Sequence, residues 1–381
     1  MEKFIYHNPT RLHFGEGVTA NIGKTAKEYG NKALLVYGKQ SIKKTGLYEN
    51  IINQLKTAEV EVFEYCGIKP NPIIDDVNNA AKIGRDNNID FIIAVGGGSV
   101  IDSAKIISIA INENADAWEI VIGKIKPQKA IPIIAVLTLA ATGTEMNPFA
   151  VVQNVETQQK IGYGNPLIYP KESFLDPLNT LTVSAEQTTN GLVDTIAHCL
   201  EAWFGEGNAE LSDRFVSAII KEIMNIGPDL LNDLGNINLR SRMLYASTMA
   251  LNGTTFLGRK SGDWGVHDIG HTLSMLYDLP HGATLSIAYP AWLKTFEKKQ
   301  KNRIEKLGYK LFKVDNENDT IYKLESFFKL INAPTRLQDV KISEEKSDEI
   351  INLLSKNKIN GLNVKMNIKD YVKITEFMFD K

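Results

Sequence analysis

The sequence has little that marks a special environment. Its two cysteines, Cys66 and Cys199, cannot build a disulfide framework, and neither belongs to a C-x-x-C pair. The net charge of −2 gives no electrostatic reason to bind nucleic acid or an anionic membrane. The longest apolar run, residues 130–137, is too short to span a bilayer and is interrupted by Pro132. Because the N-terminus also lacks the apolar stretch of a secretory signal, we expect a cytoplasmic protein.

The length and the spacing of apolar residues predict two domains. A chain of 381 residues is too long for one comfortable core. Short apolar runs at 33–37, 60–65, 91–95 and 131–137 alternate with stretches of helical periodicity such as 74–87 and 100–112. Runs that are apolar on every side are typical of strands buried in a parallel sheet, and this alternation predicts βαβ units.

The ends of the first half and the whole second half have other patterns. Residues 1–14 alternate in a way that predicts short strands broken at Asn8-Pro9, and residues 149–177 predict a hairpin and a crossing segment. After about residue 180 no convincing strand is found, whereas helical periodicity recurs. We therefore predict an α/β domain at residues 1–180 and an all-α domain at residues 181–381.

A glycine turn in the first half is suited to phosphate. The run 91–95 leads into Gly96-Gly97-Gly98-Ser99 and then into a predicted helix. Glycines let the backbone approach a pyrophosphate closely, and the N–H groups at a helix start favour its negative charge. Ser99 could cap the helix or donate to a phosphate, and Asp102 could accept from ribose or amide groups. A tight turn that binds nothing is the alternative.

Two further strand ends support a dinucleotide crevice. The run 33–37 ends at the small-residue turn 38–41, and the run 131–137 leads into the hydroxyl-rich segment 138–145. NAD-binding folds usually carry a carboxylate near the strand end to hold the ribose 2′-hydroxyl. The turn has none and includes the basic Lys39, so we predict a preference for NADP(H) over NAD(H).

Histidines cluster in the second half. Of six histidines in the chain, His267, His271 and His281 fall within fifteen residues. His267 and His271 share one face of a predicted helix, as do Asp194 and His198 on an earlier one. Carboxylate with imidazole suits Fe(II), Zn(II), Co(II) or Mn(II). Surface histidines, a pH-sensitive cluster and histidines bonded to helix-end carbonyls are the alternatives, and there is no H-E-x-x-H motif of a peptidase.

Together the two halves indicate a mechanism. A metal beside a nicotinamide would polarise a carbonyl oxygen while the cofactor carries the hydride. His271 shares the face of His267 without having to be a ligand. It is therefore the candidate for relaying a proton to that oxygen.

These motifs resemble the iron-containing (type III) alcohol dehydrogenases, and within them the butanol-dehydrogenase-like NADP-dependent aldehyde reductases. The resemblance runs from Tyr6 to at least Trp292, and its most specific parts are residues 96–105, Asp194-x-x-x-His198 and His267-x-x-x-His271 with His281. It implies a Rossmann-like dinucleotide-binding α/β domain at residues 1–180, an all-α domain at residues 181–381 that holds a metal and the substrate, and a metal site in the cleft between them. It also implies aliphatic C3–C6 aldehydes or alcohols as substrates and a homodimer joined through N-terminal strands.

The resemblance also implies the site residues. The metal ligands would be Asp194, His198, His267 and His281, with His271 near the nicotinamide and the substrate. The cofactor would be bound by Gly38, Ser41, Asn71, Gly97, Gly98, Ser99, Asp102, Thr138, Thr142, Asn147 and Lys160. Fe(II) is the expected metal, with Zn(II) as the alternative.

The sequence departs from the family pattern at three places. Residues 38–41 stand where relatives often have a run of glycines, so the phosphate contacts could differ in detail. Gly270 stands where an acidic residue is expected, which puts the tuning of His271 in doubt. Past Trp292 the resemblance is weaker and the chain is lysine-rich.

Three rival functions stay open at this point. A zinc polyol dehydrogenase of the same architecture would use NAD on glycerol-like substrates. A metal-dependent hydrolase or lyase would use the metal to activate water. A non-catalytic nucleotide-binding protein would have no activity for the histidines to support.

Overall fold

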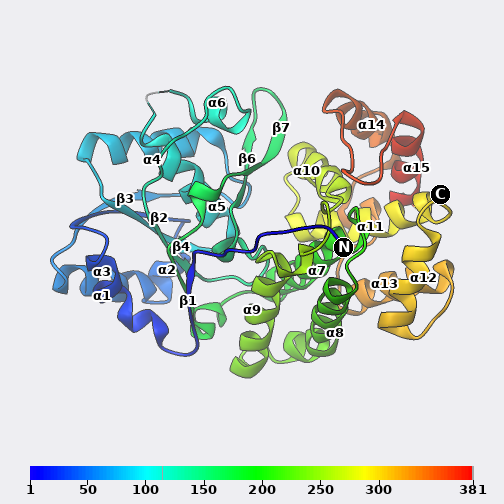
Figure 1. Cartoon of the computed structure of the whole chain (residues 1–381), viewed down its shortest axis with the longest axis horizontal. Helices are drawn as coiled ribbons and strands as arrows, with labels where there is room; N and C mark the ends of the chain where they lie inside the picture. Colours follow the sequence, from blue (N-terminus) through cyan, green and yellow to red (C-terminus); the bar gives the residue numbers. More distant parts are fainter. Residues whose placement is uncertain (114, 380–381) are drawn as a thin grey trace. The chain divides into compact units, whose positions relative to one another are not determined.

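The structure is a computed structural model that describes residues 1–113 and 115–379. It contains two compact units, whose elements are labelled in Figure 1. The α/β unit consists of His7–Val183 with Gly235–Leu244, and the helical unit of Met1–Tyr6, Ser184–Leu234 and Tyr245–Lys381. Among the described residues, no helix combines the length and apolar character needed to cross a membrane.

A six-stranded parallel sheet forms the centre of the α/β unit, in the order β1-β8-β5-β4-β2-β3. The middle strands are completely buried and rich in β-branched residues, as expected for a sheet covered on both faces. The strands are β1 (Arg11–Phe14), β2 (Lys32–Tyr37), β3 (Glu61–Cys66), β4 (Phe91–Gly96), β5 (Ile133–Leu137) and β8 (Glu172–Leu175).

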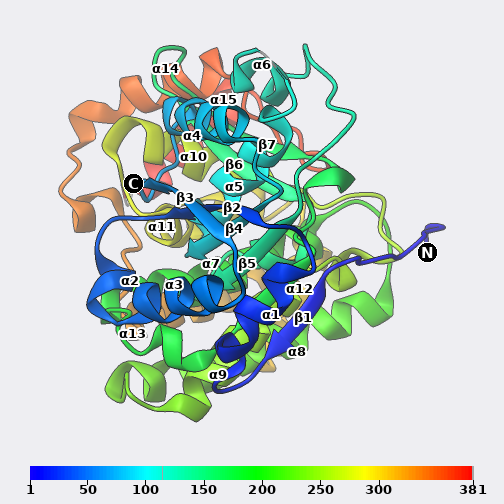
Figure 2. The ribbon, with the colours of Figure 1, turned by 90° about the vertical axis from the view of Figure 1, so that its left-hand side faces the viewer.

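Helices cover both faces of this sheet, as Figure 2 shows. On one face, α1 and α3 pack against alternate strand residues such as Leu35, Ile93 and Val136. On the other face, α5 packs against β4 and β5, and α4 lies beside α5. The helices are α1 (Ile22–Lys27), α2 (Ser41–Lys44), α3 (Leu47–Thr57), α4 (Ile74–Asn87), α5 (Gly98–Ala110) and α6 (Ala117–Val121).

The first and last parts of the α/β unit differ from the prediction in detail. Residues 1–10 form no strand, and only Arg11–Phe14 joins the sheet, as its edge strand. The predicted hairpin is present as β6 (Phe149–Asn154) and β7 (Gln159–Gly164), in a separate two-stranded sheet. The predicted crossing segment contains β8, which lies between β1 and β5.

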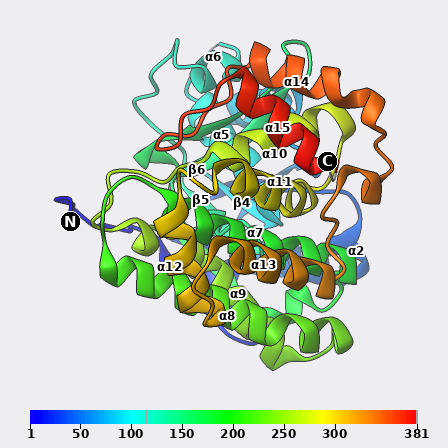
Figure 3. The ribbon, with the colours of Figure 1, turned by 90° about the vertical axis from the view of Figure 1, so that its right-hand side faces the viewer.

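The second half is helical, and no strand occurs among residues 184–379. Figure 3 shows α11 among its neighbours; it packs against α7, α10 and α15, and α7 packs against α8. The helices are α7 (Ala185–Phe204), α8 (Glu210–Asn232), α9 (Ile237–Leu251), α10 (Gly265–Tyr277), α11 (His281–Phe296), α12 (Lys301–Phe312), α13 (Glu317–Leu330), α14 (Ser347–Lys356) and α15 (Ile368–Met378).

Local sequence signals set the ends of the helices that carry the histidines. Ser184 caps α7, because its side chain accepts a hydrogen bond from the backbone N–H of Gln187 at 3.2 Å. Asp278, in the left-handed conformation, ends α10, and α11 begins at His281 directly after Pro280. The chain therefore reverses between α10 and α11, and their histidines can face a common point.

Candidate functional site

Three predicted metal ligands converge in the helical unit. Asp194, His267 and His281 each offer a ligand atom, and these atoms all lie within 4.8 Å of one another. From the Asp194 Oδ1 the distance is 4.0 Å to the His267 Nε2 and 3.8 Å to the His281 Nε2. Four ligands about 2.1 Å from a tetrahedral divalent ion would lie about 3.4 Å apart, so these spacings are close to those of a ligand set.

The fourth predicted ligand, His198, lies beside this group but outside it. Its Nδ1 is 3.7 Å from the same Asp194 oxygen, one helical turn away on α7. Its ring stacks on that of His267, with the two centroids 4.9 Å apart. Each of the three histidines therefore has a ring nitrogen within 4.0 Å of the same Asp194 oxygen.

A close approach of two helices brings His281 to this point. A Cβ atom on Gly282 would lie 2.2 Å from the carbonyl oxygen of Asn190, so only glycine allows α11 to start here against α7. Asn190 is one turn before Asp194 on α7, and His281 directly precedes Gly282. The glycine after His281 is therefore needed to place this histidine beside the carboxylate.

The chemistry of the donor atoms fits a divalent metal. Asp194, His198 and His267 are buried. Among the described residues, neither the His198 Nδ1 nor the His267 Nε2 has a hydrogen-bond partner, which is unusual for buried polar atoms. Burial and the neighbouring His267 hold the pKa of His198 well below its usual range, so this imidazole stays neutral. A metal ligand must have a free lone pair, as neutral imidazole does.

Glu201 orients one of these imidazoles, and the sequence analysis missed it. Its Oε1 accepts from the His267 Nδ1 at 2.7 Å and from the His267 backbone N–H at 3.2 Å. Its Oε2 accepts from the backbone N–H of Trp264. Burial lowers the pKa of His267, but the hydrogen bond and charge of Glu201 outweigh it and leave the pKa raised. In the neutral imidazole that donates its Nδ1 proton to Glu201, the Nε2 lone pair faces Asp194.

Aromatic rings enclose the cluster on one side. Trp264 meets His267 edge-on, with ring centroids 5.3 Å apart, and stacks on Phe256 at 5.7 Å. Trp264 adopts a left-handed conformation, with φ of 67°, directly before α10. This conformation is uncommon for a bulky residue and is fixed here by the hydrogen bond from its backbone N–H to Glu201.

His271 lies next to the cluster, as predicted from its spacing. It is buried and stacks on His281, with ring centroids 5.2 Å apart. Its Nδ1 is 3.7 Å from the carboxylate of Asp268, the acidic group one turn earlier on α10. An acidic side chain at position 270 would have no room, because a Cβ atom on Gly270 would lie 2.7 Å from the Thr284 Oγ1. The departure at Gly270 thus follows from the packing of α10 on α11.

The glycine turn lies where the sequence placed it, between β4 and α5. The neighbouring strands β2, β4 and β5 end side by side, so their carboxyl ends form one continuous edge. Thr138, directly after β5, donates its backbone N–H to Gly96 at 3.0 Å. The predicted capping role of Ser99 is wrong: the N-cap is Gly97, and the Ser99 hydroxyl donates to the Pro70 carbonyl.

Other predicted cofactor residues gather around the glycine turn. Thr142 lies against Gly98, since a Cβ atom there would be 2.7 Å from the Thr142 Oγ1. Lys160 on β7 donates to the Asn71 Oδ1 at 2.8 Å. Gly38 directly follows β2, and Ser41 is the exposed first residue of α2.

Asp102 and Asn147 are engaged with a loop of the protein itself. Asp102 accepts from the Thr144 hydroxyl at 2.6 Å and from the Val151 backbone N–H at 2.9 Å. Asn147 donates to the Gly143 carbonyl at 2.9 Å and accepts from the Phe149 backbone N–H at 2.9 Å. Their side chains hold the segment after β5 in place.

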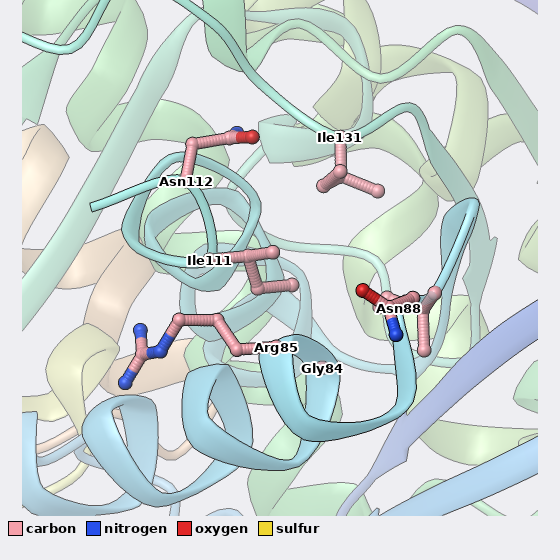
Figure 4. Close-up of a pocket in the computed structure, with 7 residues that line it drawn as sticks. Gly84, Arg85, Asn88, Ile111, Asn112 and Ile131 are labelled. Carbon is pink, nitrogen blue, oxygen red and sulfur yellow. The ribbon is translucent and has the colours of Figure 1, made fainter. Parts of the chain in front are cut away.

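The hollow drawn in Figure 4 lies at the opposite edge of the sheet. It has a volume of about 300 Å³ and is lined by residues that precede β4 and β5 or end α4 and α5. Arg85 in its wall donates to the carbonyls of Ala110 and Glu113. The hollow is therefore separate from the glycine turn and takes no part in that site.

Two models of one protein family match the first and the second half of the chain. A family model described as iron-containing alcohol dehydrogenase matches residues 9–177, and one described as the C-terminal part of that family matches residues 188–376. A probable NADH-dependent butanol dehydrogenase 1 of Bacillus subtilis is 40% identical, over 98% of this chain and 99% of the relative. The NADPH-dependent aldehyde reductase YqhD of Escherichia coli is 35% identical, over 89% of each.

A solved structure has the same fold over the whole chain. The crystal structure of an NADH-dependent butanol dehydrogenase A from Thermotoga maritima superposes with a TM-score of 0.97 at 36% identity. The match covers 100% of this chain and 99% of that chain.

The contact between Glu201 and His267 generates a prediction about metal affinity. In Glu201→Gln, one carbonyl oxygen replaces the two carboxylate oxygens that serve His267 and Trp264, and the negative charge is lost. We expect metal affinity, measured by competition with a chelator, to fall by about 10- to 100-fold. The control is Glu206→Gln, which removes an exposed pair with Lys260. Equal affinity in both variants would contradict the role of Glu201.

Proposed function

The chain belongs to the iron-containing alcohol dehydrogenase family, and we propose that it transfers hydride between NADP(H) and a small aliphatic aldehyde or alcohol. The single observation that supports this most strongly is the convergence of His198, His267 and His281 on the Asp194 carboxylate. In this proposal residues 1–180 bind the dinucleotide, and residues 181–381 bind the metal and the substrate.

The metal would be held by Asp194, His198, His267 and His281. We propose Fe(II), with Zn(II) as the alternative, because carboxylate and imidazole suit both. A bound divalent ion supplies Lewis-acid polarisation of a carbonyl oxygen. The protein's own part is to fix the donor atoms through Glu201 and to keep bulk water away with the paired rings of Trp264 and Phe256.

A proton must reach the substrate oxygen when an aldehyde is reduced. His271 is the group proposed to supply it, since its buried ring stacks on His281 beside the cluster. The carboxylate of Asp268, 3.7 Å from the His271 Nδ1, is the nearest acidic partner for that ring. The side chain of Asp268 is 41% exposed, so its carboxyl group can exchange protons with solvent.

The cofactor would lie along the carboxyl edge of β2, β4 and β5. The backbone of the glycine turn and the start of α5 suit the pyrophosphate, and hydroxyl and amide groups surround them. The proposed set is Gly38, Ser41, Asn71, Gly97, Gly98, Ser99, Asp102, Thr138, Thr142, Asn147 and Lys160.

We also propose that the protein is a cytoplasmic homodimer joined near its N-terminus. The edge strand β1 has a neighbour on one side only, and Ile5 is 97% exposed. Contiguous exposed apolar residues are typical of interaction surfaces, and Phe4 and Tyr6 flank Ile5.

The dimer proposal is tested by mass in solution. Sedimentation should give twice the chain mass of 42.4 kDa. The Ile5→Asp variant should shift the protein toward the monomer mass of 42.4 kDa. The matched control is Val155→Asp, at another exposed aliphatic residue. A monomeric unmodified protein, or an equal effect of both variants, would refute the proposal.

The proposed reaction is tested by NADPH oxidation with a panel of C3–C6 aldehydes. Activity should disappear after chelation and return with Fe(II), while Zn(II), Co(II), Mn(II) and Ni(II) are compared. His281→Ala should lose bound metal and at least about a hundredfold in kcat/KM, because a ligand to the polarising ion is gone. His7→Ala is the control, at an exposed histidine. Activity that survives complete metal removal would rule the mechanism out.

The cofactor preference is tested by kcat/KM with NADPH and with NADH. No carboxylate lies among residues 37–41, and Lys39 is exposed, so it can meet a 2′-phosphate. Lys39→Ala should lower kcat/KM for NADPH about tenfold and leave that for NADH nearly unchanged. Lys44→Ala, at an exposed lysine at the end of the neighbouring short helix α2, is the control. A clear NADH preference of the unmodified enzyme would refute the prediction.

A further inference from the structure

Lys105 on α5 is a charged side chain with no solvent exposure. Its amine lies close to five oxygen atoms of one short segment, after β5. These are the Thr144 carbonyl at 2.6 Å and Oγ1 at 2.7 Å, the Asn147 carbonyl at 2.8 Å and Oδ1 at 3.1 Å, and the Phe149 carbonyl at 2.6 Å. An ammonium group has three protons to donate, so these acceptors must share them.

Asp102, one turn earlier on α5, binds the same stretch of chain. Its Oδ1 accepts from the Thr144 hydroxyl and its Oδ2 from the Val151 backbone N–H. Burial lowers the pKa of Lys105, the charges of Asp102 and Glu145 partly offset this effect, and the resulting pKa is about 7. The two side chains of α5 therefore form a buried clamp, defined here as Asp102 and Lys105, on residues 144–151.

The clamped segment reaches the glycine turn through Thr142. The Thr144 backbone N–H donates to the Thr142 Oγ1 at 3.3 Å. The Thr142 side chain in turn lies against Gly98, where a Cβ atom would be 2.6 Å from the Thr142 Cγ2. The position of Thr142 beside the start of α5 thus depends on how Thr144 is held.

We propose that Lys105 is a positioning residue for the dinucleotide, which fixes the segment 142–149 against the glycine turn before the cofactor arrives. The inference rests on the proposed NADP(H) site but adds a residue that does not touch the cofactor. If the segment 142–149 is already ordered, cofactor binding does not have to compensate for the conformational entropy lost in ordering it. Loss of the clamp therefore weakens cofactor binding while the metal site, which lies in the other unit, keeps its chemistry.

The test compares Lys105→Met with the unmodified enzyme. The KM for NADPH, and the Kd measured directly by NADPH fluorescence, should both rise about tenfold, while kcat at saturating NADPH stays within about twofold. Thr144→Val is the second variant, because it keeps the side-chain shape but removes the hydroxyl between Lys105 and Asp102. It should raise both constants about threefold and keeps the test valid if Lys105→Met does not fold.

The matched control is Arg85→Met, at a cation that binds the other end of α5. Arg85 donates to the Ala110 carbonyl at 2.9 Å and the Glu113 carbonyl at 3.1 Å. Its loss should lower Tm but leave the KM for NADPH unchanged.

The outcomes separate the inference from the proposed function. Unchanged NADPH affinity in Lys105→Met and Thr144→Val, or an equal rise in Arg85→Met, would overturn the positioning role. Absence of NADPH binding by the unmodified protein would instead overturn the proposed function, and the inference with it. A fall in kcat without a change in KM would also contradict positioning.

Discussion

The close approach of α11 to α7 at Gly282 is the constraint on which the metal cluster depends. The contact between this glycine and the Asn190 carbonyl lies one turn before Asp194 and directly after His281. His281 is therefore supplied by the start of a helix, and its position is set by backbone packing. Sites built on rigid elements hold their geometry better than sites on loops, which suits a reaction that needs an oxygen held beside a hydride donor.

The cluster also shows how buried polar groups are balanced. Glu201 accepts a hydrogen bond from the His267 Nδ1, so that in the neutral imidazole the Nε2 keeps its lone pair. His198 is kept neutral by burial and by its neighbour. The result is a set of lone pairs that face one carboxylate, which is costly to leave without a cation and favourable around one.

Much of the fold could be predicted from apolar spacing, and the failures have physical causes. The helix Ile74–Asn87 was predicted to the residue from its apolar periodicity alone, since no side chain caps its N-terminus. Strand β8 was missed because Glu172 and Ser173 are polar yet buried. Glu172 accepts from Arg11, His13 and Tyr29, partners that no local pattern reveals.

The candidate ligands could be predicted because they recur at helical spacing. Glu201 lies seven residues after Asp194 on the same face of α7, yet it was missed. A carboxylate at that spacing is common, and only the structure shows that it meets His267.

The buried ammonium of Lys105 follows the same logic as Glu201 in the other unit. A buried charge is weak grounds for stability, since apolar replacements of similar size are often neutral or better. Its effect on conformation is more specific: five oxygens of one segment have their positions set together by one nitrogen. In each unit, then, one buried charged side chain, Glu201 or Lys105, does not itself bind a ligand. It fixes the position of the neighbouring atoms that are proposed to bind the metal or the cofactor.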